Sequence, residues 1–448
     1  MKEKLLLYVD FQFIHLSLAQ ILQKKIDCDC FAIVDLNDKP RQFFDKQEIV
    51  KFKKTWYYRD HVVKSDKKPD LEYLKSIEDR YKINLWKIAY AERAFYQFNK
   101  YYKFTRDEIL SILEQECRLF EKIINEVEPD YLLINTSDWH HMHLLCELCR
   151  AKCIKVLMLV PTRFGSRMMV SNDLDRMDQA IDYTNIEDKK RTIEQLLEYR
   201  RKYDLFKKVM IVKEKTYTYN SKTIKAALQF FLTSGNENYR KNYTNYGKTR
   251  LRALFIEGIT LLKKKFREQY MNRNFLKESD YKLPFVYFPL HLEPERVLLI
   301  GAPYYTNQIE VIKNIAKSLP IGLELYVKEH PVMSVDGWRQ TSYYKSIMEL
   351  PNVSLIHPEV KPDDIIKNCK LVISIAGTTG LEAAFYGKPA VIFSEFWGSH
   401  LLSTVHKLEK IDNISEAIKK SIEKKVDPKE LEFYVGLLER NSFEFDHT

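Results

Sequence analysis

The chain has 448 residues, of which 45% are hydrophobic and 30% charged, and this composition excludes a disordered or low-complexity protein. At roughly 150 residues per domain, the length favours two α/β domains. No apolar run approaches the roughly 20 residues that span a bilayer, which argues against an integral membrane protein. The apolar stretch near the N-terminus is interrupted by Asp10 and is too short for a signal peptide. Seven cysteines without regular spacing indicate reduced thiols.

The N-terminal half alternates strand and helix patterns, which is typical of βαβ units and a mainly parallel sheet. We expect strands at 5–9, 31–36, 131–135 and 154–160, and helical segments at 71–127 and 139–151. Residues 172–280 are charged and poor in Gly and Pro, and we interpret them as a helical insertion and a bridge.

The pattern becomes more regular from residue 288 onward. It predicts strands at 297–301, 323–328, 353–356, 371–375 and 390–393, and helices at 307–319, 343–349, 361–368 and 379–386. The fold class is therefore α/β, with two doubly wound, Rossmann-like domains facing a central cleft and helical insertions. The predicted boundaries are 1–239 for the N-terminal domain, 240–285 for a basic bridge, 286–425 for the C-terminal domain and 426–448 for a helical tail.

Positive charge is concentrated in the bridge. Residues 240–282 contain twelve Lys or Arg against four Asp or Glu, and the apolar stretch 251–262 is followed by three lysines. This pattern is typical of a basic amphipathic helix that lies on an anionic membrane surface, although a solvated helix packed on the protein has the same pattern.

The segment 371–393 has the pattern of a strand, a tight turn and a helix start. Gly377 permits the turn, Thr378 and Thr379 stand where the helix begins, and Gly380 allows close backbone approach. The N–H groups and dipole of such a helix start bind phosphate, and Glu382 in the first turn could accept hydrogen bonds from a ribose. The alternative is an ordinary capped helix start.

Two further loops carry candidate donor-binding residues. Lys328, His330 and Pro331 follow a strand directly, where open α/β folds bind ligands, and the histidine could donate a proton or a hydrogen bond to a departing phosphate. His291 and Glu295 lie on a proline-framed loop that could face the cleft or form interdomain hydrogen bonds.

In the N-terminal half, Arg163 and Arg167 follow the strand at 154–160, and their guanidinium groups suit a phosphate or carboxylate on donor or acceptor. A second loop supplies Asp138, and His140 or His141, as a possible catalytic base. Asp138 is the preferred candidate, with Asp10 as the next choice. A capped helix start at Ser137 or Asp138 explains the same loop.

Two patterns resemble metal sites, and we interpret both otherwise. Cys146, Cys149 and Cys153, close to His140, His141 and His143, follow helical spacing and are better explained as core residues. The Asp-x-Asp pairs at 27–29 and 173–175 follow no clear strand end. We therefore expect no metal and no cofactor beyond the nucleotide of a substrate.

Five segments together resemble one protein family. They are PLHLEPE (289–295), Gln308, YVKEHP (326–331), GTTGLEA (377–383) and GKP (387–389), and PTRFGSR (161–167) adds a weaker match. In this order and spacing they are similar to the capsule polysaccharide biosynthesis proteins related to bacterial β-Kdo transferases. The resemblance covers about residues 286–395, and a Gln-x-x-x-Pro element of the Kdo transferases is not evident, which leaves the donor nucleotide open.

The resemblance implies a GT-B glycosyltransferase that transfers a sugar from a nucleotide donor to a capsule-type polysaccharide or glycolipid. The donor would lie in the C-terminal domain, with His330 and Pro331 near its phosphate and Thr378, Thr379 and Glu382 at phosphate and ribose. A sugar-nucleotide 2-epimerase and a polymerase using a CDP-activated polyol are alternatives of the same fold, and nucleic-acid binding is disfavoured. We expect a cytoplasmic protein, attached peripherally to the inner face of the membrane.

Overall fold

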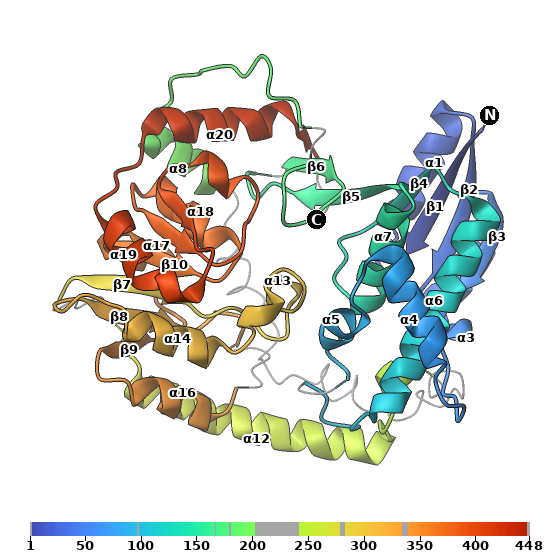
Figure 1. The fold of residues 1–448 in the computed structure, drawn as a ribbon, viewed down its shortest axis with the longest axis horizontal. Coiled ribbons are helices and arrows are strands. Elements are labelled where there is room, and N and C mark those ends of the chain that lie inside the picture. The colour runs from blue at the N-terminus through green and yellow to red at the C-terminus, as the bar shows by residue number, and fades with distance from the viewer. Residues whose placement is uncertain are drawn as a thin grey trace, which may run out of the picture. The chain divides into compact units, whose positions relative to one another are not determined.

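A computed structural model describes residues 2–95, 98–165, 167–178, 181–201, 242–277, 283–333 and 339–445 (Figure 1). The chain divides into two compact units. The first is formed by Met1–Val160, Val170–Leu174 and Ala226–Leu254, and the second by Pro161–Met169, Asp175–Lys225 and Phe255–Thr448. Within the described residues, no helix is both long enough and apolar enough to cross a membrane.

The first sheet has the order β13-β6-β5-β4-β1-β2-β3. Its strands are β1 (Glu3–Val9), β2 (Cys28–Val34), β3 (Phe52–Tyr57), β4 (Tyr131–Ile134), β5 (Lys155–Pro161), β6 (Arg167–Ser171) and β13 (Phe443–Glu444). Strands β5 to β3 in this order pair in parallel, as in doubly wound folds. Strand β1 reads as one apolar run because both of its faces are covered, and residues 5–9 are all buried.

Helices surround this sheet. They are α1 (Ile14–Lys25), α2 (Asp38–Lys46), α3 (Tyr58–His61), α4 (Leu71–Tyr81), α5 (Leu85–Tyr90), α6 (Arg106–Val127) and α7 (His140–Ala151). The longest, α6, begins at a capping box in which Thr105 and Glu108 each bond the backbone N–H of the other. Its buried face supplies much of the helical core of the unit.

The second sheet is entirely parallel, in the order β12-β11-β10-β7-β8-β9. Its strands are β7 (Phe285–Pro289), β8 (Glu324–Lys328), β9 (Val353–Ile356), β10 (Leu371–Ser374), β11 (Ala390–Ile392) and β12 (Val405–Lys407). Val286 and Phe288 pack into one core cluster with Ile312, while Phe285 and Tyr287, on the other face, are also buried. Both faces are therefore covered, and the order reverses between β7 and β10.

The helices of the second unit complete this doubly wound arrangement (Figure 1). They are α8 (Ile193–Arg201), α13 (Arg296–Leu299), α14 (Gln308–Ala316), α16 (Thr341–Met348), α17 (Pro362–Asn368), α18 (Thr378–Phe385), α19 (Ile414–Ile422) and α20 (Pro428–Arg440). Helix α12 (Arg250–Asn274) contains the end of the first unit's sequence and the start of the second's.

The predicted α/β fold class with two mainly parallel sheets is confirmed, and most predicted elements agree to within a few residues. The strand at 297–301 is wrong: these residues belong to α13 and the turn after it, and the strand that opens the unit is β7. A short apolar run fits a buried helix as well as a strand, which explains the error. The single helical region at 71–127 contains α4, α5 and α6.

Two other features differ from the sequence-based outline. Strand β3 lies at the edge of the first sheet, where Lys53 and Lys54 are exposed, and this polar pattern concealed it. Residues 161–169, placed above in the N-terminal domain, belong to the second compact unit. Much of the predicted 172–280 insertion, including residues 202–241, lies outside the described residues.

Candidate active site

The candidate site lies at the carboxyl edge of the second sheet, at the point where the strand order reverses. His291 follows β7 closely, His330 follows β8, and Gly377 precedes the helix that follows β10. Because the carboxyl ends of parallel strands meet at one edge, the fold brings together three loops that are far apart in sequence. This is the position at which open α/β sheets bind ligands.

His330 is held in a defined orientation on the turn after β8. Its Nδ1 accepts a hydrogen bond from the Val332 N–H at 3.3 Å, so in the neutral ring the proton resides on Nε2. Burial is the main cause that lowers the pKa of His330 to about 4, with Glu329 acting in the opposite direction. At pH 7 the residue is therefore a neutral hydrogen-bond donor through Nε2.

A buried ion pair supports this turn, and sequence reasoning missed it. Glu329 accepts the backbone N–H of His330 at 2.6 Å and the hydroxyl of Tyr344 at 2.6 Å. The same carboxylate pairs with Arg339, and both side chains are fully buried. A strand pattern that ends in Lys-Glu-His contains no signal that both Lys328 and Glu329 are buried.

His291 is fixed from several directions. Gln308 accepts the His291 N–H at 2.7 Å and donates to its carbonyl at 3.2 Å. The His291 ring places Nε2 2.7 Å from the carbonyl oxygen of Ala376, at the end of β10. Burial lowers the pKa of His291 to about 4, so this ring is also neutral. The structure thus places His291 in the loop after β7 at this edge, with the fully buried Gln308 as a support.

The start of α18 forms the third side of the edge. Gly377 has a φ of +82°, a conformation that favours glycine, and it precedes the helix whose first residues are Thr378 and Thr379. Gly380 also serves packing within the unit. A Cβ at this position would lie 2.4 Å from Cγ2 of Ile392 in β11, so the glycine allows the helix to pack closely on the sheet.

A pocket in the second unit opens next to this helix start. It is lined by Arg163, Thr378, Glu382 and Arg200, together with Pro161, Thr162, Phe164, Leu381, Phe396, Trp397 and Tyr434. Glu382 forms an ion pair with Arg200 of α8 at 2.5 Å. The structure therefore brings the predicted residues Arg163, Thr378 and Glu382 together in one pocket and adds Arg200, which the sequence did not suggest.

Several predicted residues have other contacts. Lys328 is 2% exposed, and its Nζ donates to the carbonyl of Pro358 at 3.0 Å. Arg167 bonds Ser442 and the carbonyl of Glu439, which anchors the end of α20. Glu295 is the N-cap residue of α13 and makes no side-chain cap hydrogen bond. Pro331 is partly buried in the turn after His330.

The candidate bases belong to the first unit. Asp138 accepts a hydrogen bond from the Thr136 hydroxyl at 2.7 Å, and Trp139 rather than Ser137 or Asp138 is the N-cap residue of α7. Asp10 lies directly after β1 and accepts hydrogen bonds from Gln12 and Asn135. Burial raises the pKa of Asp10, which improves a carboxylate as a base.

The predicted core role of the cysteines is confirmed for two of the three. Cys146 and Cys149 are completely buried on α7. Cys153 lies beyond the end of this helix and is exposed. Asp175, from the second Asp-x-Asp pair, forms an ion pair with Arg296 at 2.7 Å, and both residues belong to the second unit.

Comparison with solved structures found only weak similarity. A β-Kdo 2,7 transferase, KpsC of Thermosulfurimonas dismutans, is 14% identical, with 76% of this chain and 88% of that chain covered and a TM-score of 0.31. MnaA of S. aureus, in a structure with UDP, is 12% identical (97% and 91% covered, TM-score 0.27). A UDP-GlcNAc 2-epimerase of Methanocaldococcus jannaschii is 11% identical (97% and 98% covered, TM-score 0.29). Similarity at this level carries no argument about substrate.

The family comparison is more informative. No curated protein sequence matches this chain. Residues 187–399 match the family described as capsule polysaccharide biosynthesis protein. The matched segment includes the loops of His291 and His330 and the start of α18, which are the elements on which the resemblance depended. Residues 187–399 are thus similar to the capsule polysaccharide biosynthesis family.

Proposed function

We propose that the protein is a glycosyltransferase that transfers a sugar from a nucleotide donor to a growing capsule-type polysaccharide or glycolipid. The observation that carries this proposal is the edge of the second sheet, where the His330 loop after β8 and the start of α18 after β10 follow the two strands on either side of β7. The match of residues 187–399 to the capsule family supports the same activity.

The donor nucleotide would bind at this edge. The N–H groups at the start of α18 and the hydroxyls of Thr378 and Thr379 are suited to phosphate, and Arg163 supplies a cation in the adjoining pocket. His330 would donate a hydrogen bond from Nε2 to a phosphate oxygen and stabilise the negative charge that develops as the sugar leaves. Because its pKa is near 4, it acts as a neutral donor rather than a proton donor.

A thermal-shift experiment tests the donor site. The panel is CMP, CDP, UDP, GDP and ADP, each with and without Mg²⁺, and a ligand at 100 times its Kd adds about 2.7 kcal/mol of stability. We expect one nucleotide to stabilise the protein, and the shift to be reduced by Thr378→Val and by Glu382→Ala. The control is Glu416→Ala, which removes an exposed carboxylate on α19.

The outcomes separate the candidate functions. Absence of any nucleotide shift would overturn the donor site. Turnover of the sugar nucleotide without acceptor would indicate an epimerase instead of a glycosyltransferase. A phosphodiester in the product would indicate a polyol-phosphate polymerase.

The base would come from the first unit. Asp138 remains the candidate from sequence, and Asp10 is its competitor because burial raises the pKa of Asp10 at the carboxyl end of β1. A general base contributes roughly 100- to 10,000-fold to turnover. Asp10→Asn and Asp138→Asn therefore form a matched pair, and only the variant that lacks the base should lose this factor at unchanged nucleotide affinity. If both variants keep full activity, neither carboxylate is the base.

Helix α12 would attach the protein to an anionic membrane. Phe255, Leu262 and Phe266 are 68%, 62% and 69% exposed and follow helical spacing, and Lys263 and Lys265 lie among them. Sedimentation with vesicles containing phosphatidylglycerol tests this proposal. Charge reversal at Lys263 and Lys265 should release the protein from the vesicles, whereas charge reversal at Lys419 and Lys420 of α19 should not. Equal binding of the two variants would contradict the proposed membrane attachment.

A further inference from the structure

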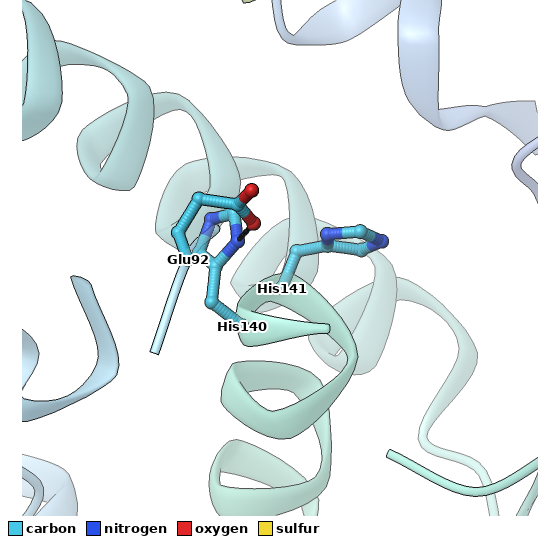
Figure 2. A group of neighbouring side chains, drawn as sticks. All are labelled: Glu92, His140 and His141. Carbon is cyan, nitrogen blue, oxygen red and sulfur yellow. Dashed lines mark hydrogen bonds and ion pairs between the residues drawn. The ribbon is translucent and has the colours of Figure 1, made fainter. Parts of the chain in front are cut away.

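A group of buried polar side chains lies in the first unit, separate from the residues used above. Glu92 follows α5, and His140 and His141 open α7. All three are buried, and each offers one ligand atom such that these atoms lie within 4.8 Å of one another. Figure 2 shows the Glu92 carboxylate against the His140 ring, with one ring nitrogen of His141 directed toward the same carboxylate.

Each imidazole has a second carboxylate on its far side. Nε2 of His140 lies 3.0 Å from both carboxylate oxygens of Glu116 on α6. Nε2 of His141 lies 3.5 Å from Asp35, which follows β2. A metal-binding histidine ordinarily has this arrangement, in which one ring nitrogen binds the ion and an outer carboxylate orients the other.

His141 is the least satisfied member of the group. Its side chain is 4% exposed, and among the described residues Nδ1 has no hydrogen-bond partner, while Nε2 has only the 3.5 Å ion pair with Asp35. A buried polar group without a partner is uncommon because its desolvation is uncompensated. A ligand between His141 and Glu92 would supply the missing interaction.

The charges of the group also favour a cation. Arg59 pairs with Asp35 at 2.6 Å, which balances that carboxylate. Glu92 and Glu116 are at most 1% exposed, and the ion pairs that the structure gives them are both with His140. His140 therefore lies between two buried carboxylates, and this negatively charged surrounding favours a cation.

We propose that Glu92, His140 and His141 bind one divalent transition-metal ion of the zinc type. Two imidazoles and one carboxylate form a common ligand set for zinc, and Glu116 and Asp35 would orient the two histidines. The ion would join the segment after α5 to the start of α7 and thereby stabilise the first unit. The proposal is independent of the glycosyltransferase activity, because none of these residues belongs to the proposed donor site.

Metal content of the full-length protein tests the proposal. The protein is stripped with EDTA, dialysed against Zn²⁺ or Co²⁺ and analysed by mass spectrometry of the metal, with the visible d–d bands of Co²⁺ as a second readout. We expect one ion per chain in the wild type. His141→Ala should reduce this by at least tenfold, since it removes a ligand whose Nδ1 has no other partner among the described residues. The matched control is His143→Ala on the same helix, which should retain the ion.

Two results would overturn the proposal. One is a wild-type protein that takes up no ion under these conditions, which would mean that protons balance the two carboxylates. The other is equal uptake by the wild type and His141→Ala. If His141→Ala does not fold, judged by circular dichroism, Glu92→Gln replaces it, because this change preserves the shape of the side chain while weakening the metal ligand.

Discussion

Replacement of Lys328 by methionine should change the stability of the protein in a direction that depends on pH. Lys328 is buried, and burial lowers its pKa from 10.5 to about 7, with Glu329 acting in the opposite direction. One pKa unit corresponds to about 1.4 kcal/mol, so the charged form is destabilised by about 5 kcal/mol in the folded state. In the folded protein Lys328 loses its proton near pH 7, whereas in the unfolded chain it keeps this proton until about pH 10.5. The free energy of unfolding of the wild type therefore increases as the pH rises from 7 to 10.5.

The variant loses this gain together with two hydrogen bonds. Lys328 donates to the carbonyls of Glu329 and Pro358, and each bond contributes about 1 kcal/mol. At about pH 6, Lys328→Met should be more stable than the wild type by about 3 kcal/mol, and at about pH 10.5 less stable by about 2 kcal/mol. The difference between the two proteins should therefore change sign within this window.

Urea unfolding across the pH range measures the effect. Lys370→Met, at an exposed position, is the control and should shift stability by less than about 0.5 kcal/mol. A difference between Lys328→Met and wild type that stays constant with pH would refute the reasoning. A strong loss of nucleotide affinity in Lys328→Met would instead assign Lys328 to the donor site.

Glu329→Gln should destabilise the protein by about 3 to 5 kcal/mol, because it removes the closer of the two carboxylates that pair with the buried Arg339 guanidinium and leaves only Glu293, at 3.6 Å. In chemical denaturation a loss below about 1 kcal/mol would contradict this. Gly380→Ala should lower the free energy of unfolding by about 1 to 3 kcal/mol, because the added Cβ would clash with Ile392. Gly258→Ala on α12 is the control: its Cβ has open space, so it should be neutral or stabilising by up to about 1 kcal/mol. Equal changes in melting temperature of the two variants would count against the packing argument. His330→Ala should lower kcat by about 100-fold or more with little change in stability. His330→Asn keeps a hydrogen-bond donor and should retain more activity. Equal activity of the two variants would argue against a neutral donor.

The fold class and the loops of the candidate site could be predicted from the sequence. Continuous apolar strands such as 371–375, separated by helical patterns, require a parallel sheet covered on both faces, and its carboxyl edge follows from that topology. His330 and Thr378 could therefore be assigned to the candidate site from local patterns. The run at 297–301 could not be assigned correctly, because a short buried helix and a short buried strand have the same composition.

Tertiary structure alone decided which side chains face the site and which support it. Glu329 rather than Lys328 carries the hydrogen bonds to the His330 turn, and its partner Arg339 is ten residues away with no spacing that links them. The group at Glu92, His140 and His141 likewise depends on a contact between segments 48 residues apart. Local periodicity reports which face of an element is buried, whereas the partner of a buried charge is fixed only when distant segments pack together.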